Sequence, residues 1–171
     1  AAGGFRDGSG LAAALAWGAD GIAMGTRFMM TQESPVPSQT KESYISAGID
    51  DIKITKKFDG LPHRLIFNDY IKTIDHSNPF TLLWISIGSA IKYKQLTQSS
   101  YKDLIKAFFA MLKGDDLTIS QSVMSANSPA IIQKAMVEGF PEEGAMPSGQ
   151  VAGIITNLPA CEDLVLEIMS D

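Results

Sequence analysis

The sequence predicts an α/β fold: the C-terminal part of a (β/α)8 TIM barrel, in the region of strands 7 and 8, with a mostly helical substrate or cap domain. Two glycine turns support the barrel, one within residues 1–10 and the other within residues 24–28. One helix and one strand fit between them, as between the two phosphate-binding loops of such barrels. After Arg64 the apolar residues follow helical spacing almost throughout, which predicts the cap.

The first predicted elements lie between the two turns. Residues 9–17 are expected to form a helix, because Leu11 and Leu15 lie on one helical face and Gly18 suits the position that ends a helix. Residues 21–24 are a short apolar run, which is typical of a buried parallel strand.

A short helix and a longer one follow the second turn. Thr26 is placed to cap a helix through residues 28–31, and the prolines within residues 33–37 end it. A further helix is expected over residues 39–47, ended by Gly48.

The pattern then changes from half-exposed strand to helix. Residues 51–57 alternate apolar and polar side chains, which predicts an edge strand centred on residues 52–55, and residues 59–62 read as a turn. The helices predicted after this turn cover residues 65–74, 80–94, 101–112, 129–137, 150–156 and 161–169.

These elements suggest three parts. Residues 1–60 would end the barrel, residues 61–143 would form the helical cap, and residues 144–171 would return to the barrel. The return begins with a glycine-containing loop at residues 144–150, just before a predicted helix. Such a loop can bring the chain back to the cup formed by the two early turns.

The two early turns have the residue types of a phosphate-binding cup. Glycine lets backbone N–H groups approach an anion because it has no Cβ, and a helix that begins after the turn adds the positive end of its dipole. Gly3, Gly4, Gly25 and Thr26 are therefore candidate phosphate-binding residues. The alternative is ordinary turn chemistry with a threonine cap. Arg27 suits a phosphate contact or a surface ion pair equally well.

Composition argues against several classes of protein. The chain has 171 residues and a net charge of −5, with no stripe of basic residues, so we expect no nucleic-acid partner. Its single cysteine, Cys161, cannot form an internal disulfide; this and the lack of a signal peptide favour a reducing, cytoplasmic setting. We expect Cys161 near a helix start, with no metal site and no membrane span. The apolar run at residues 80–91 is too short for a span and is compatible with a homodimer contact.

Three segments together resemble the nitronate monooxygenase family, also called 2-nitropropane dioxygenase-like flavoproteins. They are residues 1–8 (AAGGFRDG), residues 15–28 (LAWGADGIAMGTRF) and residues 146–155 (MPSGQVAGII). The flavin-using enoyl-acyl-carrier-protein reductase is a close relative of this family. Two departures leave the backbone donors in place: Phe5 stands where isoleucine is usual, and residues 6–10 read RDGSG where ADGRG is common.

The resemblance implies an FMN-binding (β/α)8 barrel with a helical domain inserted late. It implies that Gly3, Gly4, Gly25 and Thr26 bind the FMN phosphate, and that Ser148, Gly149 and Gln150 lie beside the flavin. The family's first six strands and the histidine base of its nitronate-oxidising members would lie in another half of the protein. We therefore expect a fragment, because the chain starts inside a loop without an initiator methionine, and we expect it to be inactive alone; no catalytic residue is assigned.

The expected function is an FMN-dependent oxidoreductase, most simply a nitronate monooxygenase that oxidises alkyl nitronates with dioxygen. One alternative is an NAD(P)H-dependent flavin reductase of the enoyl-reductase type. The others are a non-enzymatic module that binds a phosphate ligand and a helical interaction domain whose glycine turns are structural.

The remaining polar residues have simpler interpretations. Gln150 begins a helix and is expected beside the flavin or substrate, although a solvent-exposed first-turn residue is the alternative. His63 and His76 are interpreted as solvated loop histidines, and Asp7 as a turn or cap residue. The stripe of apolar side chains within residues 80–87 is interpreted as core or pocket lining.

Overall fold

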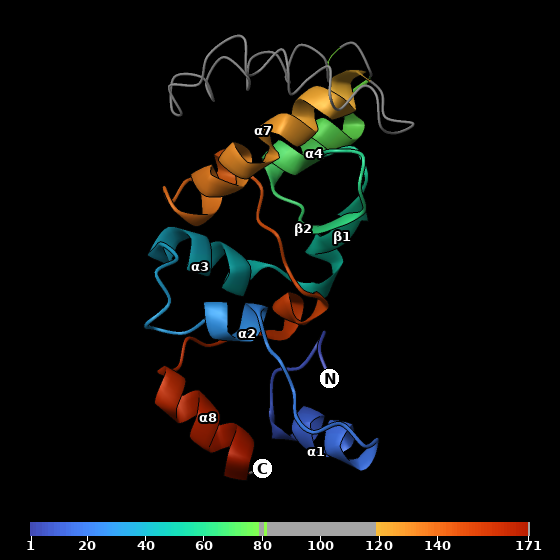
Figure 1. The fold of residues 1–171 in the computed structure, drawn as a ribbon. Coiled ribbons are helices and arrows are strands. Elements are labelled where there is room, and N and C mark those ends of the chain that lie inside the picture. Colours follow the sequence, from blue (N-terminus) through green and yellow to red (C-terminus); the bar gives the residue numbers. More distant parts are fainter. Residues whose placement is uncertain (79–80, 82–118, 171) are drawn as a thin grey trace.

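The computed structural model describes residues 1–78, 81 and 119–170, and the predicted helices at residues 80–94 and 101–112, with the stripe at 80–87, lie almost wholly outside them (Figure 1). In the described part, α2 (Thr26–Met29), α3 (Ser38–Ser46) and the hairpin of β1 (Ile52–Thr55) and β2 (His63–Ile66) lie between α4 (Asp69–His76) and α7 (Ile119–Met136) at one end and α1 (Gly8–Ala16) and α8 (Cys161–Ser170) at the other. In chain order the elements are α1 (Gly8–Ala16), α2 (Thr26–Met29), α3 (Ser38–Ser46), η1 (Ile49–Asp51), β1 (Ile52–Thr55), β2 (His63–Ile66), α4 (Asp69–His76), α7 (Ile119–Met136), η2 (Pro141–Glu143), η3 (Gln150–Ile154) and α8 (Cys161–Ser170), where η marks a 3-10 helix.

Local capping defines α1 much as the sequence predicts. The Asp7 carboxylate accepts a hydrogen bond from the Gly10 N–H at 3.0 Å, so Asp7 is the N-cap. After the helix, Gly18 adopts a left-handed φ of 90°. The predicted helix over residues 9–17 and the capping role of Asp7 are confirmed.

The strand predicted at residues 21–24 is reduced to one parallel bridge, between Ala2 and Ala23. The Ala23 N–H donates to the Ala1 carbonyl at 2.8 Å. A ladder needs a partner segment of similar length, and the described chain places only residues 1–2 alongside this run. The bridge nevertheless places both glycine turns at the same edge, because Gly3 and Gly25 follow the paired residues.

The second turn differs from its prediction in one respect. Thr26 does not cap α2: Gly25 occupies the N-cap position without a side-chain bond, and Thr26 is the first helical residue. The Thr26 hydroxyl instead accepts a hydrogen bond from the Gly149 N–H in the return loop. The helix predicted at residues 39–47 is confirmed as α3.

The β1–β2 hairpin corrects the prediction that a helix starts at Leu65. Strand β1 has the bounds predicted for the edge strand, and it pairs antiparallel with β2, Lys53 opposite Leu65. Helix α4 begins only at Asp69, because the Asn68 side chain caps it by accepting from the Ile71 N–H at 2.9 Å. The hairpin joins residues on both sides of the predicted division at residue 60.

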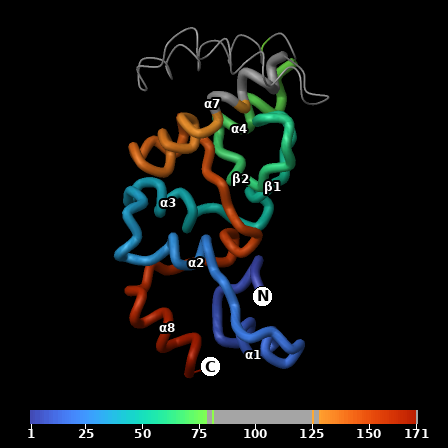
Figure 2. Tube along the Cα trace, in the orientation of Figure 1, coloured from blue at the N-terminus to red at the C-terminus, as the bar shows by residue number. Residues whose placement is uncertain are grey.

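The return loop, residues 144–150, runs along β2 like a third strand. Leu65 and Pro147 form an antiparallel bridge, and the Ser148 N–H donates to the Arg64 carbonyl at 3.1 Å. Figure 2 shows this segment descending past β2 towards α2. Chain segments far apart in sequence are thereby fixed side by side.

Helix α7 begins well before residue 129, where the sequence predicts a helix start. Pro129 lies inside the helix and cannot donate to the Ser125 carbonyl four residues earlier. The Ser128 hydroxyl donates to that carbonyl instead, at 2.9 Å. This substitution for the missing N–H lets the helix continue through the proline.

The last predicted helices form with small changes. The helix expected at residues 150–156 is the shorter 3-10 helix η3, and α8 confirms the one expected at 161–169, with Cys161 as its first residue. Two buried apolar clusters support the fold, one centred on Tyr44 and Met146 and the other on Phe58 and Leu65. No helix in the described ranges is long and apolar enough to cross a membrane.

Candidate functional site

The candidate site is a pocket of about 480 Å³ between the first glycine turn, β2 and the return loop. We call it the glycine pocket. It brings together Gly3, Gly4, Gly149 and Gln150, four of the predicted site residues. The residues that line it are Gly3, Gly4, Arg64, Gly149, Gln150, Val151 and Ile154.

The first glycine turn leaves its backbone open to the pocket. Gly3 and Gly4 adopt left-handed φ values of 96° and 81°, which side chains other than glycine rarely allow. A Cβ added at either residue would meet no atom within 4 Å, so open space lies beside both backbones. Consecutive backbone N–H groups with this freedom can form an anion-binding concavity.

The second turn supports the pocket from behind rather than lining it. Gly25 and Thr26 are not among the lining residues, but the Thr26 hydroxyl oxygen lies 2.8 Å from the Gly149 nitrogen. A Cβ at Gly149 would lie 2.9 Å from the same oxygen, so a side chain there would disturb this contact. The structure thus connects the second turn to the return loop.

Ser148 adds an unsatisfied polar atom next to Gly149. Its hydroxyl oxygen is buried and has no hydrogen-bond partner among the described residues. A buried hydroxyl usually has a partner, because desolvation without a hydrogen bond is unfavourable. Ser148 is not among the residues that line the glycine pocket, so this hydroxyl lies outside the pocket surface.

Tyr44, a residue with no functional role predicted from the sequence, makes a hydrogen bond to the return loop just before Ser148. The buried phenol of Tyr44 on α3 donates to the Pro147 carbonyl at 2.5 Å. Burial raises the pKa of Tyr44 well above its ordinary value, so the phenol keeps its proton at neutral pH. Nothing in the local sequence predicts this contact, because its partner is more than one hundred positions away.

Arg64 is the second residue that sequence reasoning missed. The prediction placed it at a helix start, but it is a half-buried residue on β2 that lines the glycine pocket. Within the described chain its guanidinium makes no hydrogen bond or ion pair. It is also the only charged residue among those lining the pocket.

Arg27 has a structural role that the sequence did not suggest. It is 5% exposed, and its guanidinium donates to the carbonyl and side-chain oxygens of Asn157 at 3.2 and 2.8 Å. Burial lowers the pKa of Arg27 from its ordinary value, while Glu167 opposes that shift. The interpretation as a surface ion pair is therefore wrong, and the guanidinium is engaged by Asn157.

The two histidines differ from each other. His63 lies on β2, with Nε2 2.8 Å from the buried Asp59 carboxylate and its ring 5.8 Å from the Phe58 ring in an edge-on arrangement. The interpretation of His63 as a solvated loop residue is wrong, because the hairpin places it against these two partners. His76 is exposed at the end of α4, as expected, near the Lys72 carbonyl.

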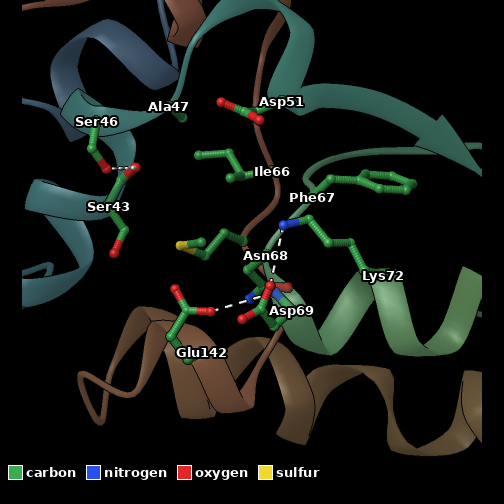
Figure 3. A pocket seen from close by; sticks show the side chains of 11 residues that line it. Ser43, Ser46, Ala47, Asp51, Ile66, Phe67, Asn68, Asp69, Lys72 and Glu142 are labelled. Carbon is green, nitrogen blue, oxygen red and sulfur yellow. Dashed lines mark hydrogen bonds and ion pairs between the residues drawn. The ribbon is translucent and has the colours of Figure 1, made fainter.

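A second pocket, of about 270 Å³, has a different chemistry (Figure 3). Its charged groups are already paired: Lys72 Nζ lies 3.1 Å from the Asp69 carboxylate, and Glu142 accepts from the Asp69 N–H. Asp51 accepts from the Gly48 N–H. Because these groups satisfy one another, the pocket offers a ligand less than the glycine pocket does. The described residues also contain no cluster of His, Cys, Asp or Glu suited to a metal ion.

Comparison with known proteins gives a family match over the whole chain. The model of the nitronate monooxygenase family matches residues 1–171. A (3aS,4S,5R,7aS)-5-hydroxy-7a-methyl-1-oxo-octahydro-1H-indene-4-carboxyl-CoA dehydrogenase from Rhodococcus jostii is 44% identical over all 171 residues, and one of the same name from Mycobacterium tuberculosis is 40% identical. This chain spans 48% of each of these relatives, about half their length.

Other similarities are shorter or more distant. A probable nitronate monooxygenase from Staphylococcus aureus is 39% identical over 72 residues, or 42% of this chain and 20% of that protein. The structure of FabK from Thermotoga maritima matches 99% of this chain and 42% of its own, with a TM-score of 0.64 and 26% identity. A nitroalkane oxidase structure from Streptomyces ansochromogenes matches 99% of this chain and 38% of its own, with a TM-score of 0.56 and 22% identity, which supports the fold alone.

Proposed function

This chain belongs to the nitronate monooxygenase family, and we propose that it supplies the phosphate-binding part of an FMN-dependent oxidoreductase. One observation carries the proposal: the glycine pocket gathers Gly3, Gly4, Gly149 and Gln150 from opposite ends of the chain. The family match agrees with the resemblance of the three glycine-containing segments. An α/β fold with helices around a short hairpin agrees with the similarity to FabK.

In this proposal the backbone holds the cofactor. The N–H groups of Gly3 and Gly4, which line the pocket, would bind the FMN phosphate, whose charge suits glycine turns of this kind. Those of Gly25 and Thr26, on the neighbouring turn that is bonded to Gly149, would complete the phosphate cup. When bound, FMN supplies the acceptor for electrons from the substrate. Gly149 and Gln150 of the return loop line the pocket and would face the flavin and exclude water from it, with Ser148 directly before them in the chain.

For the substrate, we favour the CoA thioester of a hydroxylated bicyclic carboxylic acid. The two indene-carboxyl-CoA dehydrogenases match all 171 residues, at 44% and 40% identity. The S. aureus nitronate monooxygenase matches 72 residues. A dehydrogenase removes two hydrogens from its substrate, and FMN is a suitable two-electron acceptor for that step.

Oxidation of alkyl nitronates with dioxygen is the second candidate. The family description and the S. aureus relative favour it. In either case we propose that the rest of a barrel is needed, and that the 171-residue chain alone is inactive. Residues 1–60, 61–143 and 144–171 would then serve as barrel end, helical cap and returning segment.

The test is a spectrum of the purified full-length protein, followed by release of the cofactor and measurement of its mass. We expect flavin absorption and the mass of FMN. Anaerobic addition of the indene-carboxyl-CoA thioester, an alkyl nitronate, NADH or NADPH then identifies the donor, because the true donor bleaches the flavin. A colourless protein that takes up no FMN would contradict the proposal. Bleaching by the nitronate alone would favour the second candidate, and bleaching by NADH or NADPH alone would favour a flavin reductase.

A further inference from the structure

We propose that Arg64 is a phosphate-binding residue of the glycine pocket. The proposal rests on the function proposed above and adds a ligand contact to it. Its starting point is the location of Arg64, which is half-buried on β2 and lines the same pocket as Gly3, Gly4 and Gln150.

The guanidinium of Arg64 has no ion-pair or hydrogen-bond partner in the described chain, whereas several other cations there do. Arg6 pairs with Asp7, Lys72 with Asp69 and Lys134 with Glu143. Another, Lys41, is buried but donates to the carbonyls of residues 31 and 34. Because no protein group occupies its donors, the Arg64 guanidinium is free to bind an anionic ligand in the pocket.

The backbone around Arg64 is firmly held, so the side chain starts from a fixed point. Arg64 pairs with Ile54 across the hairpin, and its carbonyl accepts from the Ser148 N–H at 3.1 Å. The next residue, Leu65, forms the bridge to Pro147. The strand that carries Arg64 is therefore joined directly to the loop that carries Gly149 and Gln150.

The chemistry of the pocket indicates a phosphoryl group. The planar guanidinium can donate two parallel hydrogen bonds to phosphate oxygens, and the glycine turn opposite it offers backbone N–H groups. A volume of about 480 Å³ exceeds what a phosphate ion needs, so the group would belong to a larger ligand. Two sources have this chemistry: the phosphate of FMN and the phosphates of the CoA part of an acyl thioester.

The experiment compares Arg64→Gln with wild type and with Lys53→Ala in the full-length protein. Lys53→Ala removes one positive charge from an exposed residue of the neighbouring strand that does not line the pocket. Three measurements are made: the Kd for FMN from flavin fluorescence, the KM for the acyl-CoA thioester against its N-acetylcysteamine analogue, and the melting temperature of the apoprotein with and without pyrophosphate.

If Arg64 contacts the cofactor, Arg64→Gln raises the Kd for FMN at least tenfold. If it contacts the substrate, the variant raises the KM for the CoA thioester at least tenfold but leaves that of the phosphate-free analogue unchanged. In both cases pyrophosphate stabilises wild type and Lys53→Ala more than Arg64→Gln. The assignment would be overturned if Arg64→Gln kept the Kd for FMN and the KM for the CoA thioester within twofold of wild type and gained as much melting temperature from pyrophosphate as wild type does.

Two further outcomes remain informative. If Arg64→Gln does not fold, Arg64→Lys decides, because it keeps the charge but loses the paired hydrogen bonds. A loss of affinity relative to wild type supports the proposal, and an unchanged affinity overturns it. If wild type binds no FMN, the proposed function fails on its own. The pyrophosphate measurement then still tests whether Arg64 binds phosphate.

Discussion

The contact between Thr26 and Gly149 offers the sharpest test of how the site is assembled. Valine at position 26 has nearly the shape of threonine and keeps the backbone N–H, but it cannot accept the hydrogen bond from the Gly149 N–H. Thr26→Val therefore separates the role of the side chain from the proposed role of the backbone in binding phosphate. The change leaves one N–H of the return loop without its acceptor.

The magnitude follows from the geometry. The bond is 2.8 Å long and half-buried, and an unsatisfied N–H costs about 1–3 kcal/mol when fully buried. For a half-buried group we expect about 1–2 kcal/mol. If the return loop must be ordered to bind FMN, the same energy weakens binding about 5- to 30-fold, because 1.4 kcal/mol is a factor of about ten.

The assay is FMN titration of the full-length apoprotein, combined with thermal melting. The matched control is Thr73→Val, since the Thr73 hydroxyl donates to a carbonyl within the exposed face of α4, away from the pocket. We expect Thr26→Val to lower the melting temperature by a few degrees and to weaken FMN binding, with little effect from Thr73→Val. Equal FMN affinity in wild type and Thr26→Val would refute the link between the second turn and the return loop.

Three further predictions concern the same site and its surroundings. Gly25→Asp should abolish FMN retention without unfolding the protein, because it places a negative charge where the phosphate is expected; retention in a folded variant would contradict this. Gln150→Ala should lower turnover at least fivefold while His76→Ala stays within twofold, as measured by steady-state kinetics, and the reverse pattern would remove Gln150 from the site. The Glu33 carboxylate accepts from the Cys161 N–H, which lowers the pKa of Glu33, so its stabilising effect exists above the ordinary value of 4.5 and is lost as pH falls through the lowered pKa. Melting curves from pH 6 to pH 3 should therefore show a smaller decline for Glu33→Gln, and identical declines would exclude the contact.

Local sequence features predicted the elements whose boundaries are set locally. Helix α1 has its capping Asp7 and its terminating Gly18 within a few residues of the ends, and both function as expected. Strand β2 was missed because apolar residues 66, 67, 71 and 74 also fit a helical face. The pairing of β2 with β1 and with the return loop decides between the two, and that information is not local.

The site shows the same division between local and distant information. The glycine turns could be identified from composition and spacing, because their backbone freedom is a property of the residue itself. The roles of Thr26 and Tyr44 could not, since their partners in the return loop lie 123 and 103 positions away. Arg64 faces the pocket only because a hairpin forms where the sequence favoured a helix.

Three separate elements hold the same short stretch of the return loop, residues 147–149. Tyr44 donates to the Pro147 carbonyl, the Arg64 carbonyl accepts from the Ser148 N–H, and the Thr26 hydroxyl accepts from the Gly149 N–H. Consecutive backbone groups fixed in this way lose their freedom when the protein folds, so a ligand need not order them on binding. The site's affinity should therefore depend on these three hydrogen bonds, none of which involves the ligand, and the second turn, α3 and β2 should contribute to it together rather than independently.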